Sequence, residues 1–416
     1  MLPSECPYPE SQPENTANHP LGTSASEGQC SQCKRDFRRC PECQTANRWL
    51  ARFCRHCGRA LEARNWLPGQ ALSPLHERQV SWPQRWSSPL SCGFVPNWAG
   101  LLDGRAFFLG KRGEVRTLVR QPLGLEQPGL GNLPVTSEPA YLHGYMAIPG
   151  EDQLTLIDLL DNRTAARRVQ RLRGHLLCPV ASDQAQWLAA LVHDGDNRSL
   201  QLFKLAQGRF QLAWNQVVDG GGPDSQRIPR LFWCEDVLVC FNEQGVLTGH
   251  NPVNGQELFR QHCPVAPAAR EPWVGGPQAY WSGIDGSIWR LRTRPELQLH
   301  QIASSNSLTM LSMAVGPEDL VASYGRTLLR VDLDTDRCEL LELPYYCTVA
   351  PWVGRSQAVA LTEEGHLYRL TVGTQTFRVE SSLKLPGEFS RSQLSPFWSG
   401  RDWIVVDQSG QVFIGE

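Results

Sequence analysis

Residues 365–374 read GHLYRLTVGT, and residues 286–291 read GSIWRL. In both stretches a glycine follows an acidic residue, and apolar and polar side chains then alternate apart from the apolar pairs Leu367-Tyr368 and Ile288-Trp289. Such alternation is typical of a β-strand with one buried face. The glycine supplies the backbone freedom that a tight hairpin turn needs. Both stretches therefore predict a β-hairpin whose second strand starts directly after the glycine.

The same arrangement recurs along the chain from about residue 90. Eight turns of this kind are found, at Asp103-Gly104, Glu151-Asp152, Asp196-Asn197, Gln244-Gly245, Asp285-Gly286, Tyr324-Gly325, Glu364-Gly365 and Ser409-Gly410. Their last residues are separated by 48, 45, 48, 41, 39, 40 and 45 positions. A period of about 40 to 45 residues with several short strands per unit is the signature of a β-propeller. No stretch after residue 100 has the pattern of an amphipathic helix, so we expect an all-β chain.

The predicted propeller covers residues 95–416, and its last unit ends after its inner strands with the sequence QVFIGE at 411–416. The missing outer strand must come from the other end of the propeller. We expect it within the connector at residues 65–98, which is rich in Trp and Pro. Such a closure removes an exposed sheet edge. Eight turns favour eight blades, and seven blades would result if the first and last partial units formed one blade.

The repeats resemble the blades of quinoprotein-type (PQQ-like) propellers, which read roughly G-x-[LV]-[YW]-x-[LV]-[DN]-x-x-[TN]-G. Gly365 to Thr374 and Gly286 to Leu291 match this pattern best, and Asn251 to Phe259 matches it in part. The WD40 propellers are the nearest competitor, but no Trp-Asp dipeptide ends any unit. The enzymes of the quinoprotein family are periplasmic, and many carry an adjacent cysteine pair near the cofactor. This chain has neither a secretory signal nor a Cys-Cys dipeptide, so we expect no oxidoreductase activity from the resemblance.

The composition excludes several classes of protein. The chain has 416 residues, 41% hydrophobic and 20% charged residues, and a formal net charge of −2. No window reaches the roughly 18 to 20 apolar residues of a membrane helix, and the N-terminus has no basic and apolar leader. We therefore expect a cytoplasmic location. Residues 1–29, with much Pro, Ser and Glu, predict a flexible arm.

Residues 30–64 contain the motif that carries chemistry. Half of the 14 cysteines lie in the first 57 residues, and six of these form three C-x-x-C pairs. Two pairs, Cys40/Cys43 and Cys54/Cys57, are separated by ten residues. Two such pairs can direct four sulfurs to one point, which is the tetrahedral arrangement that Zn²⁺ prefers. The sequence thus predicts a zinc site with four thiolate ligands and no open position, which is a structural and not a catalytic site.

This segment resembles the zinc-ribbon family, including the double zinc-ribbon type, whose pattern reads C-P-x-C-x-x-x-N-x-x-x-A-x-F-C-x-x-C-G-x-x-L. The matching positions besides the cysteines are Pro41, Asn47, Ala51, Phe53, Gly58 and Leu61. Gln44 stands where glycine is usual. The likeness implies a small ribbon whose folding depends on its metal.

Cys30 and Cys33 look like the second knuckle of an upstream ribbon. The only candidate partner knuckle begins at Cys6, where Pro9 replaces the second cysteine. His19 could complete a Cys₃His set with Cys6, Cys30 and Cys33. A second zinc and a degenerate ribbon without metal are both open alternatives.

The cysteine-rich module is also basic. Residues 30–64 hold nine Lys and Arg against three acidic residues, a net charge of +6 before the −2 that a Cys₄ zinc site contributes. Two explanations of this charge are open. The arginines keep a module with a small core soluble, or they bind an acidic partner protein or nucleic acid. The seven cysteines after residue 90 show no pairing rhythm, and we expect isolated buried thiols there.

No catalytic motif is found, and the histidines and acidic residues form no recognisable catalytic constellation. We therefore expect a non-catalytic scaffold for protein–protein interaction, with a structural zinc ribbon and a propeller that serves as a docking platform. One alternative is a nucleic-acid-associated protein that binds through the basic ribbon. The other is a propeller enzyme, such as a PQQ-like oxidoreductase, with a small-molecule site in its central channel.

Overall fold

The structure, a computed structural model, describes the strands at 27–29, 36–39 and 46–48, and residues 82–415. Gaps in this last range are 103–104, 121–122, 127–134, 137–138, 143–144, 151–152, 159–166, 172–174, 182–186, 195–196, 207–208, 219–229, 235, 243, 269–272, 276–277, 294–295, 305–311, 373–375, 393 and 400. The described residues form strands and turns and contain no helix. The prediction of an all-β chain is confirmed. Nowhere in these residues is there a helix long and apolar enough to cross a membrane.

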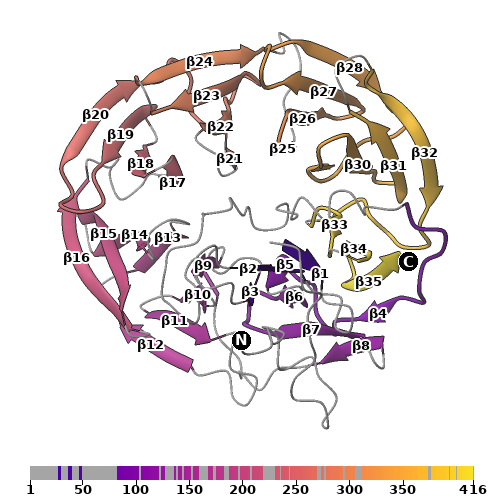
Figure 1. Ribbon diagram of the computed structural model, residues 1–416, viewed down its shortest axis with the longest axis horizontal. Helices are drawn as coiled ribbons and strands as arrows, with labels where there is room; N and C mark the ends of the chain where they lie inside the picture. Colours follow the sequence, from indigo (N-terminus) through magenta and orange to yellow (C-terminus); the bar gives the residue numbers. More distant parts are fainter. Residues whose placement is uncertain are drawn as a thin grey trace.

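The described part of residues 82–415 contains eight four-stranded antiparallel sheets, which are arranged in a ring (Figure 1). We number them as blades 1 to 8 in chain order. The first strand of a blade lies nearest the centre of the ring and the last lies at its rim, as Figure 1 shows for β17 and β20. This ring of radial sheets is a β-propeller, as the repeat period predicts.

The first four blades take their strands in chain order. Blade 1 has β5 (Trp98–Leu102), β6 (Arg105–Leu109), β7 (Val115–Arg120) and β8 (Leu123–Glu126). Blade 2 has β9 (Ala140–Leu142), β10 (Tyr145–Pro149), β11 (Gln153–Asp158) and β12 (Arg167–Arg171). Blade 3 has β13 (His175–Ala181), β14 (Trp187–Asp194), β15 (Asn197–Ala206) and β16 (Arg209–Val217). Blade 4 has β17 (Arg230–Cys234), β18 (Val237–Phe241), β19 (Val246–His250) and β20 (Glu257–His262).

The remaining blades follow the same order except the last, which borrows one strand. Blade 5 has β21 (Trp273–Gly275), β22 (Gln278–Ser282), β23 (Ile288–Arg292) and β24 (Gln298–Ala303). Blade 6 has β25 (Ser312–Val315), β26 (Asp319–Tyr324), β27 (Thr327–Asp332) and β28 (Cys338–Glu342). Blade 7 has β29 (Trp352–Val353), β30 (Gln357–Leu361), β31 (His366–Thr371) and β32 (Arg378–Lys384). Blade 8 has β33 (Phe397–Trp398), β34 (Trp403–Val406), β35 (Gln411–Gly415) and β4 (Leu90–Ser91).

The ring closes where β4 pairs with β35 in blade 8. The residues before β4 continue this contact, because Trp86 forms a bridge with Gly415 and the Ser87 amide donates to the Ile414 carbonyl at 2.8 Å. A strand that precedes blade 1 in the sequence thus forms the rim of blade 8. Hydrogen bonds between the two ends of the propeller hold the ring shut and leave β35 without a free edge.

Burial along the strands explains their composition. All residues of β18 and of β26 are buried; β18 is entirely apolar, and the buried polar residues of β26 are Asp319, which pairs with Arg330, and Ser323. The rim strand β28, with sequence CELLE, alternates between exposed and half-buried residues. Inner strands are covered on both faces by neighbouring blades, while rim strands are covered less, so the sequence changes from continuous to alternating apolar residues.

Hydrophobic clusters join the blades to one another. Within the described residues, each of the eight junctions between successive blades has its own cluster. At the closing junction, Phe397 and Ile404 of blade 8 pack with Ala106 and Phe108 of blade 1. The core is therefore a ring of interfaces, and each blade depends on both neighbours.

The glycine turns in blades 4 to 8 have the positive φ that their sequences predict, at Gly245, Gly286, Gly325, Gly365 and Gly410. In blade 4 the Asn242 side chain accepts hydrogen bonds from the amides of Gln244 and Val246. Asp407 in blade 8 does the same for Ser409 and Gln411. Each of these turns joins the second strand of its blade to the third.

One predicted turn is out of phase. Residues Asp103-Gly104 lie outside the described part, but β5 ends at Leu102 and β6 begins at Arg105, so this connection joins the first strand of blade 1 to the second. The equivalent of the other turns lies between β6 and β7, where Gly113 has a φ of 81°. Both connections of blade 1 contain glycine, so the turn signal alone could not fix the phase.

The N-terminal strands β1 (Glu27–Gln29), β2 (Asp36–Arg39) and β3 (Ala46–Arg48) form a separate antiparallel sheet in the order β1-β2-β3. Because β2 is central and both pairings are antiparallel, the chain leaves β1 for β2 at one end of the sheet and leaves β2 for β3 at the other. The sequence between β1 and β2 contains Cys30 and Cys33, and the sequence between β2 and β3 contains Cys40 and Cys43.

Candidate functional site

All predicted zinc ligands lie outside the described residues. These are Cys40, Cys43, Cys54 and Cys57 for the first site, and Cys6, His19, Cys30 and Cys33 for the second. The described strands lie next to two of the pairs, because β2 ends at Arg39 and β3 begins at Ala46. Four cysteine thiolates are a donor set that suits Zn²⁺. Both zinc sites stay predictions.

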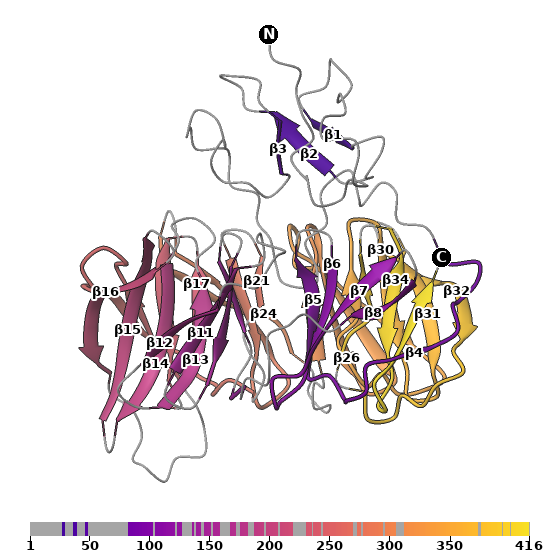
Figure 2. The ribbon, with the colours of Figure 1, turned by 90° about the horizontal axis from the view of Figure 1, so that it is seen from below.

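The two faces of the propeller carry different connections. In each blade the turn between the second and third strands lies on the same side as the connection to the next blade (Figure 2). We call this side the turn face. The opposite face holds the bridge between Trp86 and Gly415, because β35 starts at the turn face and ends at Gly415.

The most exposed aromatic side chains of the described residues lie on the turn face, between blades 6 and 7. Tyr345 is 36% exposed and Tyr346 is 53% exposed. The Tyr345 ring stacks on His366, with centroids 4.9 Å apart and planes 13° apart. The guanidinium of Arg326 lies 5.9 Å from the centroid of the Tyr346 ring. We call these four residues the tyrosine patch.

Charge on the turn face is unevenly distributed. The turns and connections of blades 5 to 8 carry exposed or half-exposed acidic residues at Asp285, Glu363, Glu364 and Glu388, and basic residues at Arg326 and Arg391. Arg326 is already paired, with 3.5 Å between its guanidinium and a carboxylate oxygen of Glu342. The surroundings of the tyrosine patch are therefore net negative.

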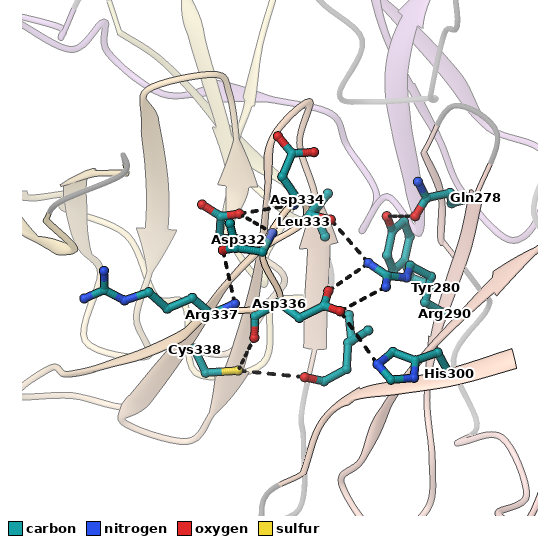
Figure 3. Close-up of polar contacts among 12 residues, drawn as sticks. Gln278, Tyr280, Arg290, His300, Asp332, Leu333, Asp334, Asp336, Arg337 and Cys338 are labelled. Carbon is teal, nitrogen blue, oxygen red and sulfur yellow. Dashed lines mark hydrogen bonds and ion pairs between the residues drawn. The ribbon is translucent and has the colours of Figure 1, made fainter. Parts of the chain in front are cut away.

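A charged cluster joins blades 5 and 6 near the rim (Figure 3). Arg290 on β23 donates two hydrogen bonds to the Asp336 carboxylate, at 2.8 and 3.0 Å, and one to the Leu333 carbonyl at 3.2 Å. His300 Nε2 lies 3.7 Å from the same carboxylate. Asp336 is also the only described non-glycine residue with a positive φ, 57°. Arg290 thus holds the turn between β27 and β28 against the preceding blade.

Asp332, Asp334 and Asp336 alternate along this turn, a spacing that some cation-binding loops share. In this turn, carboxylate oxygens of Asp332 and Asp336 are engaged by hydrogen bonds within the protein. The Asp332 side chain accepts hydrogen bonds from the amides of Thr335 and Asp334, and these bonds hold its pKa below the usual range. Asp336 is bound by Arg290. The described residues contain no group of three or more potential metal ligands, and the turn is structural.

Arg330 forms a second charged group inside blade 6. Its side chain is 2% exposed, and its guanidinium lies 2.7 Å from Asp319 and 3.2 Å from Glu339. Burial raises the pKa of Asp319, and the adjacent Arg330 acts in the opposite direction. Since partners surround the guanidinium, this pair contributes to the core of the blade.

Between blades 3 and 4 a neutral arrangement takes the place of the charged cluster. Trp214 Nε1 donates to the Pro252 carbonyl at 2.9 Å, and Gln216 Nε2 donates to the Gly255 carbonyl at 2.8 Å. His250 is buried, with Nδ1 3.3 Å from the same carbonyl and Nε2 3.0 Å from the Thr248 hydroxyl. Burial lowers the pKa of His250. A carbonyl only accepts, so Nδ1 carries the proton and Nε2 of the neutral ring can accept from Thr248.

The described cysteines of the propeller have the environment that the sequence predicts, with one exception. The buried thiols are Cys92, Cys234, Cys240, Cys263 and Cys347. Burial raises the pKa of Cys92, Cys240 and Cys347 to about 12, which leaves almost no reactive thiolate at neutral pH. Cys338 on the rim strand β28 is exposed and departs from the prediction.

The ring of eight sheets defines this chain as a β-propeller with a small N-terminal sheet. No family model matches the sequence, and no curated protein matches it. Among solved structures it is similar to BamB from Moraxella catarrhalis, with a TM-score of 0.55 and 12% identity over 79% of this chain and 98% of that chain. Sqt1 from Saccharomyces cerevisiae has a TM-score of 0.59 and 10% identity over 80% of this chain and 98% of its own.

A third similar structure is the β-propeller domain of Cps50 (Swd1) from Myceliophteria thermophila. It has a TM-score of 0.50 and 13% identity, and the match covers 70% of this chain and 99% of that domain. At such low identity these likenesses show the fold alone. They confirm the propeller and leave the chemistry to the residues of this chain.

Sequence reasoning did not find the tyrosine patch, although a signal for it exists. The connections after blades 4 and 7 begin with Cys263-Pro264 and Leu385-Pro386, and the connection after blade 6 begins with Leu343-Pro344. Two tyrosines follow only in the last case. Aligning the repeats by these dipeptides places the two tyrosines opposite Val265-Ala266 and Gly387-Glu388, so large aromatic side chains stand where the other two repeats have none.

Proposed function

We propose that this chain is a non-catalytic scaffold for protein–protein interaction, located in the cytoplasm. The propeller offers a rigid docking platform, and the N-terminal module is a zinc ribbon held by Cys40, Cys43, Cys54 and Cys57. The observation that carries the proposal is the pair of exposed tyrosines on the turn face, because interface hot spots are enriched in tyrosine and arginine.

The conspicuous charged groups support this assignment. Arg290 and Arg330 bind carboxylates that hold a turn or a blade in place, and the buried thiols have raised pKa values. Each of these groups has a structural partner or environment. Among the described residues, the exposed tyrosines then stand out as a surface suited to binding.

The ribbon has a structural task in this proposal. A tetrahedral Cys₄ site supplies folding energy to a module whose own core is small. A second zinc held by Cys6, His19, Cys30 and Cys33 is part of the proposal as an option. A reduced cytoplasm keeps such thiolates available for metal.

One experiment tests the scaffold and the ribbon together. The full chain and its Cys40→Ser/Cys54→Ser variant are purified from native extract by affinity, with zinc and bound proteins measured in the same samples by mass spectrometry. We expect about one zinc per chain to be lost in the variant, along with partners of the ribbon, while partners of the propeller remain. An organic cofactor bound to the propeller, with no bound protein, would contradict the scaffold role.

A second candidate function follows from the charge of +6 on residues 30–64. A basic ribbon can bind nucleic acid, and such binding weakens steeply as salt rises. Titration of the full chain with DNA and RNA oligonucleotides at about 50 and 200 mM salt distinguishes the candidates. Absence of binding at the lower salt removes this alternative.

A further inference from the structure

The tyrosine patch is held in place by the backbone on both sides. The Leu343 amide donates to the Arg326 carbonyl at 2.8 Å, and the Cys347 amide donates to the Gly325 carbonyl at 2.9 Å. The Tyr346 carbonyl accepts from the Glu363 amide of blade 7 at 2.9 Å. Tyr345 and Tyr346 therefore belong to a segment that is tied to the turns of two successive blades.

The two rings are also fixed by their neighbours. Tyr345 stacks on His366, whose ring centroid lies 6.0 Å from that of the buried Tyr368. This stack of three rings starts in the interior and ends in solvent at Tyr345. Tyr346 lies against Gly325, where an added Cβ would come within 3.1 Å of its ring atoms Cδ1 and Cε1. Rings that are already ordered lose little conformational entropy when a partner covers them.

The charges around the patch select the chemistry of the partner. Glu363 and Glu364 lie in the turn that bonds to Tyr346 and precedes His366. Two basic residues stand beside the patch: Arg326 is engaged by Glu342 and by the Tyr346 ring, and Lys384 is the cross-strand partner of His366. A phosphate backbone or an acidic segment would be repelled by these carboxylates, whereas lysine or arginine would be attracted.

We propose that the tyrosine patch binds an extended, basic segment of a partner protein. A proline or an aliphatic side chain of the segment packs on the rings of Tyr345 and Tyr346, and its lysine or arginine side chains pair with Glu363 and Glu364. Tyrosine faces accept both apolar and cationic groups. This inference rests on the proposed docking function and gives the platform a place and a partner chemistry.

A photo-crosslinking experiment in the full chain tests the place. Tyr345→p-benzoylphenylalanine keeps an aromatic ring at the patch, and Leu340→p-benzoylphenylalanine is the matched control. Leu340 is 71% exposed on the rim strand β28 of the same blade, away from the turn face. After irradiation in native extract, mass spectrometry identifies the crosslinked segments. We expect captured segments at position 345 that are rich in lysine and arginine, and far fewer at position 340.

A charge reversal tests the chemistry. Glu363→Lys/Glu364→Lys in the crosslinking chain should reduce capture at position 345 by about tenfold, because two attractive charges become repulsive. Asp334→Lys, an exposed residue in a turn on the opposite face, should leave it unchanged. Thermal unfolding of each variant checks that the ring is intact.

Each outcome decides one of the two proposals. Capture of acidic segments, of nucleic acid, or of residues 30–64 of this chain at position 345 overturns the basic partner and leaves the docking function standing. Equal capture at positions 345 and 340 removes the patch as the site. No captured protein at either position, together with no bound protein in the affinity purification, overturns the docking function itself.

Discussion

Two junctions of the ring bind the same element in different ways. At both junctions a blade holds the turn between the third and fourth strands of the blade that follows it. Between blades 3 and 4 the donors are the neutral groups of Trp214 and Gln216, and the acceptors are backbone carbonyls. Between blades 5 and 6 the donor is the guanidinium of Arg290, and the main acceptor is the carboxylate of Asp336.

The difference shows that the same element of the propeller is anchored at these two junctions by unlike chemistry. The contact partners lie 38 and 46 positions apart, which is close to one repeat. A charged anchor gives stronger hydrogen bonds but must compensate the desolvation of two ions, while a neutral anchor is weaker and involves no ions. The two junctions should therefore differ in how mutation, salt and acid affect them.

The largest effect is expected from Arg290→Ala. This change removes three hydrogen bonds and leaves the Asp336 carboxylate without its main partner, in a residue with a positive φ. The free energy of unfolding should fall by roughly 2 to 3 kcal/mol. Urea unfolding of the full chain, followed by tryptophan fluorescence, measures this loss.

Two variants sharpen the result. Arg337→Ala removes an arginine that is 64% exposed and paired with Glu339, and should cost less than about 1 kcal/mol. Arg290→Lys keeps the charge but cannot donate two parallel hydrogen bonds to the Asp336 carboxylate, so the variant should recover only part of the lost stability. If Arg290→Lys is as stable as the parent chain, the geometry of the pair is unimportant and the comparison fails.

A smaller effect is expected from Trp214→Phe at the neutral junction. The ring remains apolar, but the donor to the Pro252 carbonyl is lost, and one hydrogen bond of this kind is worth about 1 kcal/mol. The loss should be the same at about 0.05 and 0.5 M salt, whereas the loss in Arg290→Ala should shrink at the higher salt. Urea unfolding at both salt concentrations measures the contrast. A salt-dependent loss in Trp214→Phe would show that the neutral junction includes a charge that matters.

The sequence could predict those parts of the fold that rest on local signals. A glycine with positive φ marks the turns of blades 4 to 8, and the missing outer strand of the last unit points to a strand from the N-terminal side. In blade 1 the signal is ambiguous, because Gly104 and Gly113 stand at successive connections. The cysteine spacing of the ribbon is likewise a local signal, and its zinc stays a prediction.

The anchors and the tyrosine patch are harder to predict, for a physical reason. Trp214 and Arg290 stand at different strands of their blades and bind different acceptors, so no repeated residue marks the anchor. Unrelated side chains anchor the same turn at the two junctions. A search for repeated residue types therefore does not detect these contacts. Tyr345 and Tyr346 follow the apolar-Pro or Cys-Pro dipeptide in one repeat and not in the other two that share it. This difference becomes visible only when the repeats are aligned.

The smallest effect is expected from acid at the neutral junction. Burial lowers the pKa of His250 in the folded chain, so the unfolded chain binds a proton first as the pH falls below about 6.5. The contribution of the neutral ring to stability is complete above that pH and is lost progressively below it. We therefore expect the urea midpoint of the parent chain to fall between pH 7 and pH 5.

His250→Gln separates this contribution from other acid effects. Glutamine binds no proton in this range, so the difference in unfolding free energy between the parent and the variant should decrease as the pH falls from 7 to 5. His262→Gln replaces an exposed histidine on β20 of the same blade and is the matched control for the substitution itself. A constant difference between parent and His250→Gln over this range would mean that acid does not act through His250. Together with the salt response of Arg290→Ala, this measurement tells whether salt weakens the charged junction and acid weakens the neutral one, as the chemistry of the two junctions predicts.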